Sequence, residues 1–308
     1  MGYIYQPGKF NENTWLIDAA MKNTEGNRVR NGYAAYLIKT DDGANCLINA
    51  GARTGAESIY KKLKKLGAWP LQKLILTHSH WDHSQGIIYF REKVEEEGLA
   101  PIEIFASEKA IPYLKDQSYN TCFVVNDNNP ELINIEGVNP LKDKEKLSVN
   151  KELSLEIIET PGHMEDHIAI YDKKNKTAFV GDTPGIHWFA DLYVCNSNSP
   201  FWSEKDYLES IKKIKSLDLD FLCIAHFGVL TDGDIMPFLD NCVSMYFKWM
   251  EFFNQNINKL DDPKSLLDLM WDMLYQEFSK MPYLKPNLEN DLKHAINYYK
   301  GLKSISKN

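Results

Sequence analysis

The sequence lacks the features of a membrane-spanning, secreted or nucleic-acid-binding protein. No apolar run approaches the roughly 20 residues that cross a bilayer, so we expect no transmembrane helix. Residues 1–8 contain no basic segment followed by an apolar stretch, which argues against a secretory signal. The net charge is -8 and the chain has no long basic block, so we expect no nucleic acid among its partners.

Cysteine is scarce, and no two cysteines form a Cys-x-x-Cys pair. The five residues are Cys46, Cys122, Cys195, Cys223 and Cys242. This pattern favours buried free thiols in a reducing compartment, and we expect a cytoplasmic protein. With 308 residues, of which 44% are hydrophobic and 25% charged, the chain is large enough for one α/β domain with an appendage.

Apolar patterns predict that strands and helices alternate up to about residue 230. Strands are expected at 32–38, 45–49, 71–76, 102–106, 153–158, 169–171, 178–180 and 222–225. The first two should form a hairpin, and so should the pair at 169–171 and 178–180. Helices are expected at 55–66, 84–97 and 203–217, the last capped by Ser203, and another after a cap at Ser107. Residues 116–150 should form a long loop of the lid or binding kind.

The pattern changes after Gly228, where only helices are expected. They should cover residues 234–258, 262–280 and 288–303, with Asp262 as the cap of the second and Pro263 in its first turn. Aromatic residues recur at helical spacing in the first of these helices, at Tyr246, Trp249, Phe252 and Phe253. We expect them to pack in a helical core, with pocket lining as the alternative.

Seven side chains of the metal-binding kind stand where predicted strands end. Four of them fall within six positions after the strand at 71–76, and the other three each follow a later strand: His78, His80, Asp82, His83, His163, Asp182 and His226. Imidazole binds zinc and iron, and a carboxylate can bridge two ions. The pattern predicts two divalent metal ions per chain, zinc or iron, with manganese as an alternative.

These motifs resemble those of the metallo-β-lactamase fold of dinuclear metallohydrolases. The resemblance is carried by His78-Ser79-His80-Trp81-Asp82-His83, Gly162-His163, Gly181-Asp182 and Ala225-His226. Within that superfamily the first motif is similar to the glyoxalase II pattern. Residues 162–172 and the helical C-terminus are similar to the pseudomonal quinolone-response thioesterase.

The resemblance implies an α/β architecture, an αββα sandwich of four layers. Residues 1–230 would form the catalytic domain, and residues 231–308 a helical extension that caps the active site. By the same resemblance, His78, His80 and His163 bind one metal, Asp82, His83 and His226 bind the second, and Asp182 bridges both. Asp82 and Asp182 would be the catalytic carboxylates.

Three positions refine this expectation. Asn49 stands where many relatives have an aspartate that orients a metal ligand, and it can still accept a hydrogen bond. Phe227, after His226, is expected to narrow the pocket. His80 occupies a position that is typically glutamate in the flavodiiron oxygen reductases, which favours hydrolysis over redox chemistry.

We therefore expect a hydrolase of a small ester or thioester that uses a metal-bound hydroxide as its nucleophile. A phosphodiesterase, a metal-binding sensor with slow turnover and a redox diiron enzyme are the alternatives. The expected partner is a small molecule, without nucleic acid or membrane, and the apolar extension is compatible with a homodimer. His167 should be a packed core histidine, with support of a metal ligand or contact with the substrate as the alternative. Residues 187–189 should form a pocket wall or a surface loop.

Overall fold

The structure of the protein is a computed structural model. It describes residues 2–19, 21–22, 28–29, 33–119, 133–188, 192–195, 197, 201–226 and 228–274, together with Leu292, Ile296, Tyr299 and Lys300. Phe227, Phe189 and Cys122, for which there were sequence-based expectations, lie outside these residues.

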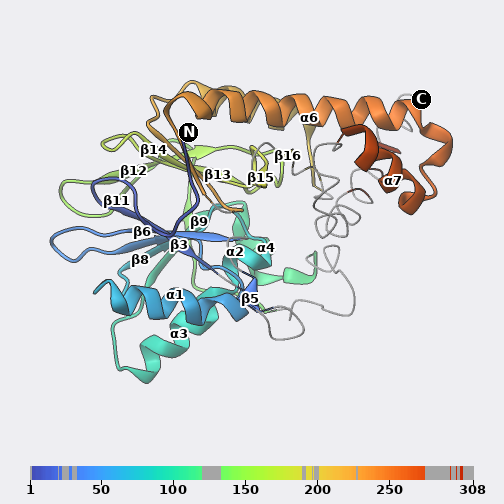
Figure 1. The fold of residues 1–308 in the computed structure, drawn as a ribbon. Helices are drawn as coiled ribbons and strands as arrows, with labels where there is room; N and C mark the ends of the chain where they lie inside the picture. The colour runs from blue at the N-terminus through green and yellow to red at the C-terminus, as the bar shows by residue number, and fades with distance from the viewer. Residues whose placement is uncertain are drawn as a thin grey trace.

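In the described part of the chain, two seven-stranded sheets form the centre of the molecule (Figure 1). In spatial order, the first sheet contains β10 (Asn139–Leu141), β9 (Glu103–Ser107), β8 (Lys73–Ile75), β7 (Cys46–Ile48), β6 (Ala34–Ile38), β3 (Thr14–Asp18) and β2 (Gly8–Lys9). The second contains β1 (Tyr3–Ile4), β18 (Val229–Thr231), β17 (Phe221–Ile224), β14 (Thr177–Gly181), β13 (Ile168–Asp172), β12 (Ser154–Glu159) and β11 (Lys146–Ser148). Two short hairpins, β4 (Met21–Lys22) with β5 (Arg28–Val29) and β15 (Ile186–Trp188) with β16 (Leu192–Val194), stand apart.

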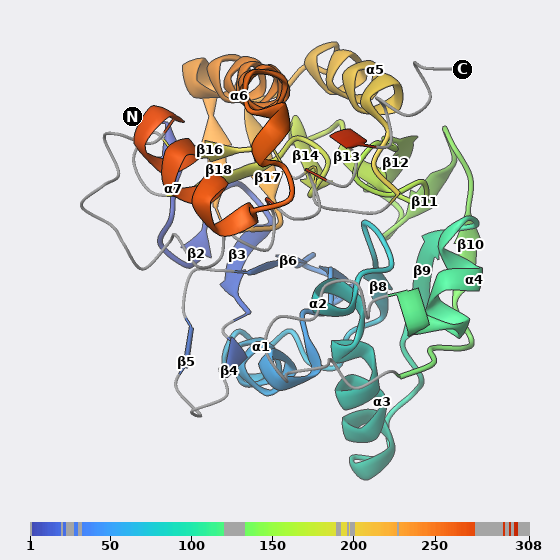
Figure 2. The same ribbon diagram turned by 90° about the vertical axis from the view of Figure 1, so that its right-hand side faces the viewer.

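Helices cover the outer face of each sheet (Figure 2). The helices are α1 (Arg53–Lys65), α2 (Trp81–Ser84), α3 (Gly86–Glu96), α4 (Ala110–Lys115), α5 (Glu204–Lys215), α6 (Ile235–Gln255) and α7 (Pro263–Leu274). In Figure 2, α1 and α3 lie below the first sheet, while α5 and α6 lie above the second. The layers therefore follow the order αββα, which confirms the predicted fold class.

Alternate residues of the central strand β6 pack in two different hydrophobic cores, one on each side of the sheet. In β6, Tyr36 and Ile38 belong to the core between the two sheets, whereas Leu37 belongs to the core beneath α1 and α3. Successive strand residues point to opposite faces, so a continuous apolar run suits a strand buried on both sides. The hairpin of β6 and β7, with Tyr36 opposite Ile48, is the one expected from the sequence.

The predicted helix at 84–97 is wrong at its beginning, because two helices stand there. The chain turns into α2 at Trp81, and α3 begins at Gly86. Backbone groups at the junction bond outside the helix: Ala50 N–H donates to His83 O, and Gly86 N–H donates to Gly51 O, each at 2.8 Å. Asp82 and His83 therefore lie on a short helix of their own.

Several short strands were not predicted. Residues 116–150 contain β10 and β11, and β18 follows the strand that was expected to be the last. Each has three residues, and its strand conformation depends on backbone hydrogen bonds to a neighbouring strand. Ser107 ends β9 rather than capping a helix. Its Oγ accepts from Lys109 N–H at 3.3 Å, and α4 begins at Ala110.

The helix caps at the other two sites agree with prediction. Ser203 Oγ accepts from Asp206 N–H at 3.3 Å at the start of α5, and Asp262 Oδ1 accepts from Ser265 N–H at 3.2 Å at the start of α7. The structure describes the helix predicted at 262–280 only as far as Leu274, and it describes only four residues of the helix predicted at 288–303. The remainder of both helices is therefore untested. No helix in the described ranges is long and apolar enough to cross a membrane.

The long helix α6 leads from the sandwich to α7 (Figure 1). Its first half packs on the second sheet through Phe238 and Tyr246. Its second half, with Trp249, Phe252 and Phe253, packs against α7 and against Leu292, Ile296 and Tyr299. The four aromatic residues that recur at helical spacing are all buried, which confirms that they belong to the core.

Candidate metal centre

The first group of predicted ligands converges from both sheets. His78 and His80 follow β8, while His163 follows β12 and Asp182 follows β14. One nitrogen or oxygen from each lies within 4.8 Å of the others. His163 Nε2 and His80 Nδ1 are 3.0 Å apart, and His163 Nε2 is 3.6 Å from Asp182 Oδ2. Two ligand atoms bound tetrahedrally to one zinc ion lie about 3.3 Å apart, so the spacing suits a metal ion.

The second group contains Asp82, His83 and His226, again with ligand atoms within 4.8 Å of one another. His83 Nε2 lies 3.4 Å from Asp82 Oδ2 and 3.5 Å from Asp182 Oδ1. His226 Nε2 lies 3.0 Å from Asp182 Oδ2. The carboxylate of Asp182 therefore stands between the two groups, and all seven predicted residues are brought together.

The ring of His78 is oriented from behind by Thr77 and Asn49. Asn49 Oδ1 accepts from the backbone N–H of Thr77 at 3.0 Å and from its hydroxyl at 3.1 Å. The Thr77 hydroxyl oxygen is then left to accept from Nδ1–H of His78, 3.1 Å away. The fully buried Nε2 of His78 has no hydrogen-bond partner among the described residues. That nitrogen is thus held with its lone pair toward the group, as a metal ligand requires.

His167 holds the backbone that carries Asp182. Its Nε2 accepts from Asp182 N–H at 3.1 Å and from Thr183 N–H at 3.4 Å, and its Nδ1 lies 3.0 Å from Thr160 Oγ1. A Cβ added at Gly181, where φ is +52°, would lie 2.3 Å from this Nε2. Burial, followed by His163, lowers the pKa of His167 to about 3, so the ring is neutral. His167 is therefore a packed core residue, as expected, and it also positions the candidate ligand Asp182.

The turn that carries His226 is fixed by β6. The hydroxyl of Tyr36 lies 2.6 Å from Ile224 O and 2.7 Å from Gly228 O, and it donates to these carbonyls. The ring of Tyr33 packs against the His226 ring with centroids 5.0 Å apart. A strand of the first sheet therefore positions a candidate ligand of the second.

The protonation states also suit cation binding. Burial, and then the neighbouring imidazoles, hold the pKa of His78 and His80 well below the usual range, so both are neutral. Burial opposes charge on His83, but Asp82 and Asp182 raise its pKa to about 10. The carboxylates of Asp82 and Asp182 therefore stabilise a positive charge on His83. A metal ion would take the place of that proton, since metal ligands must be deprotonated.

Comparison with known proteins agrees with this geometry. The family model of the metallo-β-lactamase superfamily matches residues 29–226, which include all seven predicted ligands. The chain belongs to the metallo-β-lactamase superfamily. Membership identifies the protein as a metal-dependent hydrolase of that superfamily, with a His/Asp site of the dinuclear type.

Its sequence relatives include hydrolases with a named substrate. "Hydroxyacylglutathione hydrolase 1" of Vibrio vulnificus (strain YJ016) is 24% identical over 229 residues, which are 74% of this chain and 74% of that protein. A hydroxyacylglutathione hydrolase of Psychromonas ingrahamii is 27% identical over 149 residues, which are 48% of this chain and 45% of that protein. Hydroxyacylglutathione hydrolases are thus among the low-identity sequence relatives of this superfamily member.

Solved structures support the fold of this superfamily member. A metallo-β-lactamase family protein from Thermus thermophilus superposes with a TM-score of 0.63 at 18% identity, covering 94% of each chain. A metallo-β-lactamase from Pontibacter korlensis superposes with a TM-score of 0.57 at 17% identity, covering 78% of this chain and 98% of that one. At these identities the likeness concerns the fold alone.

Two residues that contact Ser79, between two candidate ligands, were not predicted from the sequence. Asp166 is buried, and its Oδ2 accepts from the backbone N–H of Ser79, between His78 and His80, at 2.9 Å. The hydroxyl of Tyr119 donates to Ser79 Oγ at 2.7 Å. These contacts join residues 87 and 40 positions apart, so only the fold brings them together.

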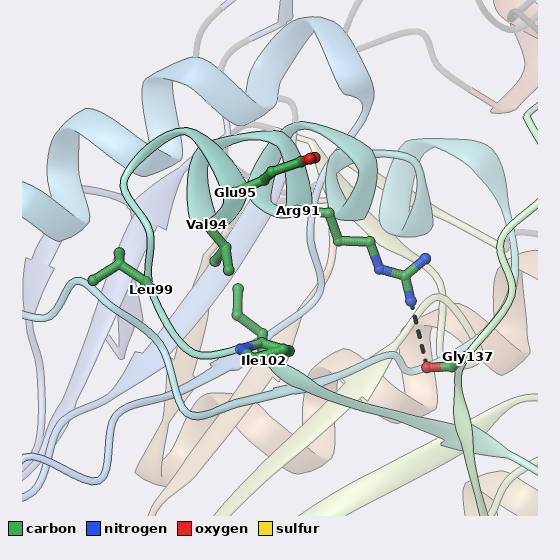
Figure 3. Close-up of a pocket in the computed structure, with 7 residues that line it drawn as sticks. Arg91, Val94, Glu95, Leu99, Ile102 and Gly137 are labelled. Carbon is green, nitrogen blue, oxygen red and sulfur yellow. Dashed lines mark hydrogen bonds between the residues drawn. The ribbon is translucent and has the colours of Figure 1, made fainter.

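His187 was expected in a pocket wall or a surface loop. Its side chain is buried, so it does not belong to a surface loop, and it packs between the rings of Tyr3 at 4.3 Å and Phe238 at 6.2 Å. A separate hollow beside α3 is lined by Arg91, Val94, Glu95, Leu99, Pro101, Ile102 and Gly137 (Figure 3). There Arg91 donates to the carbonyls of Glu136 and Gly137, and none of the seven candidate ligands lines the hollow.

Proposed function

We propose that the protein is a dinuclear metal-dependent hydrolase that cleaves a small ester or thioester. The position of Asp182 supports this most directly. Its Oδ2 lies 3.0 Å from His226 Nε2 and 3.6 Å from His163 Nε2, while its Oδ1 lies 3.5 Å from His83 Nε2. A carboxylate between two sets of imidazoles can bind two cations at once, as in two-metal hydrolytic sites.

The donor set assigns each ion to a group of side chains. One ion would be held by His78, His80 and His163, the other by Asp82, His83 and His226, and both by Asp182. Zinc or iron suits these donors, with manganese as an alternative. When bound, two such cations supply a water that ionises near neutral pH and an electrophile for the substrate's oxygen.

The two carboxylates would take different roles because their surroundings differ. Asp182 is 2% exposed, and His167 fixes its backbone, so it serves as a rigid support between the groups. Asp82 is 9% exposed and lies in the first turn of α2. It is the better placed of the two to accept a proton during the reaction and release it to solvent.

The named activity of the sequence relatives supports a thioester among the candidate substrates. We further propose a small-molecule substrate and a boundary near residue 230, after which the helical extension covers the site. Supporting this, Phe238 of α6 contacts His187, and His187 lies only five residues after Asp182.

The test combines elemental analysis with a panel of chromogenic esters, thioesters and phosphodiesters. We expect about two metal ions per chain and hydrolysis of esters or thioesters. His80→Ala and Asp182→Asn should each lower bound metal and reduce kcat/KM by more than the ~100-fold that loss of an outer-shell partner costs.

Asp218→Asn is the matched control, because the Asp218 side chain is 72% exposed and pairs with Lys176 far from the candidate ligands. Normal turnover and metal content in His80→Ala or Asp182→Asn would overturn the assignment. If the protein bound two ions but cleaved only phosphodiesters, the proposed ester or thioester substrate would be wrong and a phosphodiester would take its place.

A further inference from the structure

An aromatic cluster borders the first group of candidate ligands. It contains Tyr113 on α4, Tyr119 and Phe201. The ring of Tyr119 lies 6.1 Å from the ring of His80, measured between centroids. The hydroxyl of Tyr113 donates to Glu165, which lies two residues after His163. The cluster is therefore tied to both loops that supply histidines to this group.

The three rings pack edge to face in a triangle. The centroids of Tyr113 and Tyr119 are 5.1 Å apart, those of Tyr113 and Phe201 are 5.4 Å apart, and those of Tyr119 and Phe201 are 6.0 Å apart. The interplanar angles are 71°, 67° and 76°, in the range that aromatic quadrupoles favour. The rings thus form a preorganised surface made from separate chain segments.

The cluster differs from the aromatic core of α6 because it reaches the surface. Phe201 is 36% exposed, and both tyrosines are half-buried, whereas Trp249 and Phe253 are buried. The hydroxyls of the two tyrosines are already bonded to Glu165 and Ser79, so the rings offer mainly carbon to a ligand. Ligand pockets are lined predominantly by such apolar and aromatic groups.

We propose that Tyr113, Tyr119 and Phe201 form a subsite for an apolar, preferably aromatic, acyl group of the substrate. The proposal rests on the proposed hydrolase function. It places the carbonyl group of the substrate at the metal centre and the apolar group against the rings. The carboxylate of Glu165 beside Tyr113 disfavours an anionic group at this position, as does the net charge of -8.

The first experiment measures kcat/KM for 4-nitrophenyl acetate, butyrate, hexanoate and phenylacetate. In the unchanged protein we expect kcat/KM to rise toward hexanoate and phenylacetate. Phe201→Ala and Tyr119→Ala should each lower the phenylacetate-to-acetate ratio about threefold to tenfold, as loss of an aromatic pair would. Tyr119→Phe keeps the ring and should keep most of the ratio.

Phe247→Ala is the matched control, because Phe247 is an exposed phenylalanine on α6 outside the cluster. Its ratio should equal that of the unchanged protein. Equal ratios in the unchanged protein, Phe201→Ala and Tyr119→Ala would overturn the subsite.

A second measurement separates the subsite from catalysis. Calorimetry on the metal-loaded protein compares the binding of phenylacetate and acetate, which are products rather than substrates. Tighter binding of phenylacetate that Phe201→Ala weakens would support the subsite even if no ester were hydrolysed, and the hydrolase proposal alone would then fail. Hydrolysis of the esters without any preference in either measurement would remove the subsite and leave the hydrolase.

Discussion

At the scale of single residues, Asp166 is the side chain that most needs an explanation. It is buried, and its Oδ1 has no hydrogen-bond partner among the described residues, while Oδ2 accepts from Ser79 N–H. Burial raises its pKa to about 6, against the opposing effect of the bonds from Ser79. A buried carboxylate is costly to keep. Its contact with the backbone between His78 and His80 makes it a positioning residue for both.

We predict that Asp166→Ala lowers metal affinity about 10- to 100-fold, the usual cost of removing an outer-shell partner. The reason is that Ser79 N–H loses its acceptor and the segment between two ligands is released. Asp166→Asn keeps an oxygen acceptor and should lose less. Competition with a chromogenic chelator measures the affinity, and Asp218→Ala, at an exposed position, is the control. Equal affinities for Asp166→Ala and the control would contradict the role.

The candidate ligands could be predicted from the sequence, whereas their supports could not. Four ligand-type residues within six positions, after a strand, constitute a local signal that needs no knowledge of the fold. Asp166 and Tyr119 act through hydrogen bonds to a residue 87 and 40 positions away, and Tyr36 through bonds to residues 188 and 192 positions away. No periodicity marks such partners. Asn49 is intermediate, because the family pattern pointed to it and the structure shows its bond to Thr77.

At the scale of elements, most of the confirmed predictions concern long elements, although the three-residue strands β7 and β8 were expected and the five-residue strand β3 was not. β12, β13, β14, α1, α5 and α6 have enough residues for a pattern of buried and exposed positions, and each was expected close to its place. The edge strands β10 and β11 and the inner strand β18 have three residues each, and their backbone pairing with neighbouring strands is not visible in the sequence. The break between α2 and α3 depends on contacts with residues 50 and 51, which lie in another loop.

That break leads to a prediction about Gly86. A Cβ added there would lie 2.0 Å from Ala50 O and 2.8 Å from Ala50 C, both backbone atoms. Gly86→Ala should therefore push α3 away from the end of β7 and displace Asp82 and His83 on α2. We expect a loss of about 1–3 kcal/mol in the free energy of unfolding, as for other overpacked sites, together with a lower metal content.

Urea unfolding and elemental analysis check both parts of this expectation. Gly8→Ala is the matched control, because nothing lies within 4 Å of a Cβ added at Gly8. If Gly86→Ala unfolded at the same urea concentration as Gly8→Ala and kept its metal, α2 would not depend on this contact.

At the scale of the whole molecule, the candidate ligands come from both halves of the sandwich. His78, His80, Asp82 and His83 follow a strand of the first sheet, whereas His163, Asp182 and His226 follow strands of the second. Ions bound by all seven would link the two sheets. A ligand that binds only the folded state stabilises it by about 2.7 kcal/mol when its concentration is 100 times its Kd.

We therefore predict that removal of metal by a chelator lowers the melting temperature, and that zinc added back restores it. Scanning calorimetry of the same preparation before and after treatment measures the change. Asp182→Asn should show a smaller effect of the chelator, since one shared ligand is altered. A melting temperature that did not respond to chelator or zinc would show that the ions contribute nothing to the folded state.

Because the candidate ligands come from two sheets, the amount of bound metal should report whether the two sheets are correctly packed. A change anywhere that slides one sheet against the other alters the separation of donor atoms that belong to opposite halves. The amount of bound metal would then fall, even if the altered residue lay far from the histidines. A library of random variants could therefore be sorted for intact sandwiches by metal content alone, before any substrate is identified.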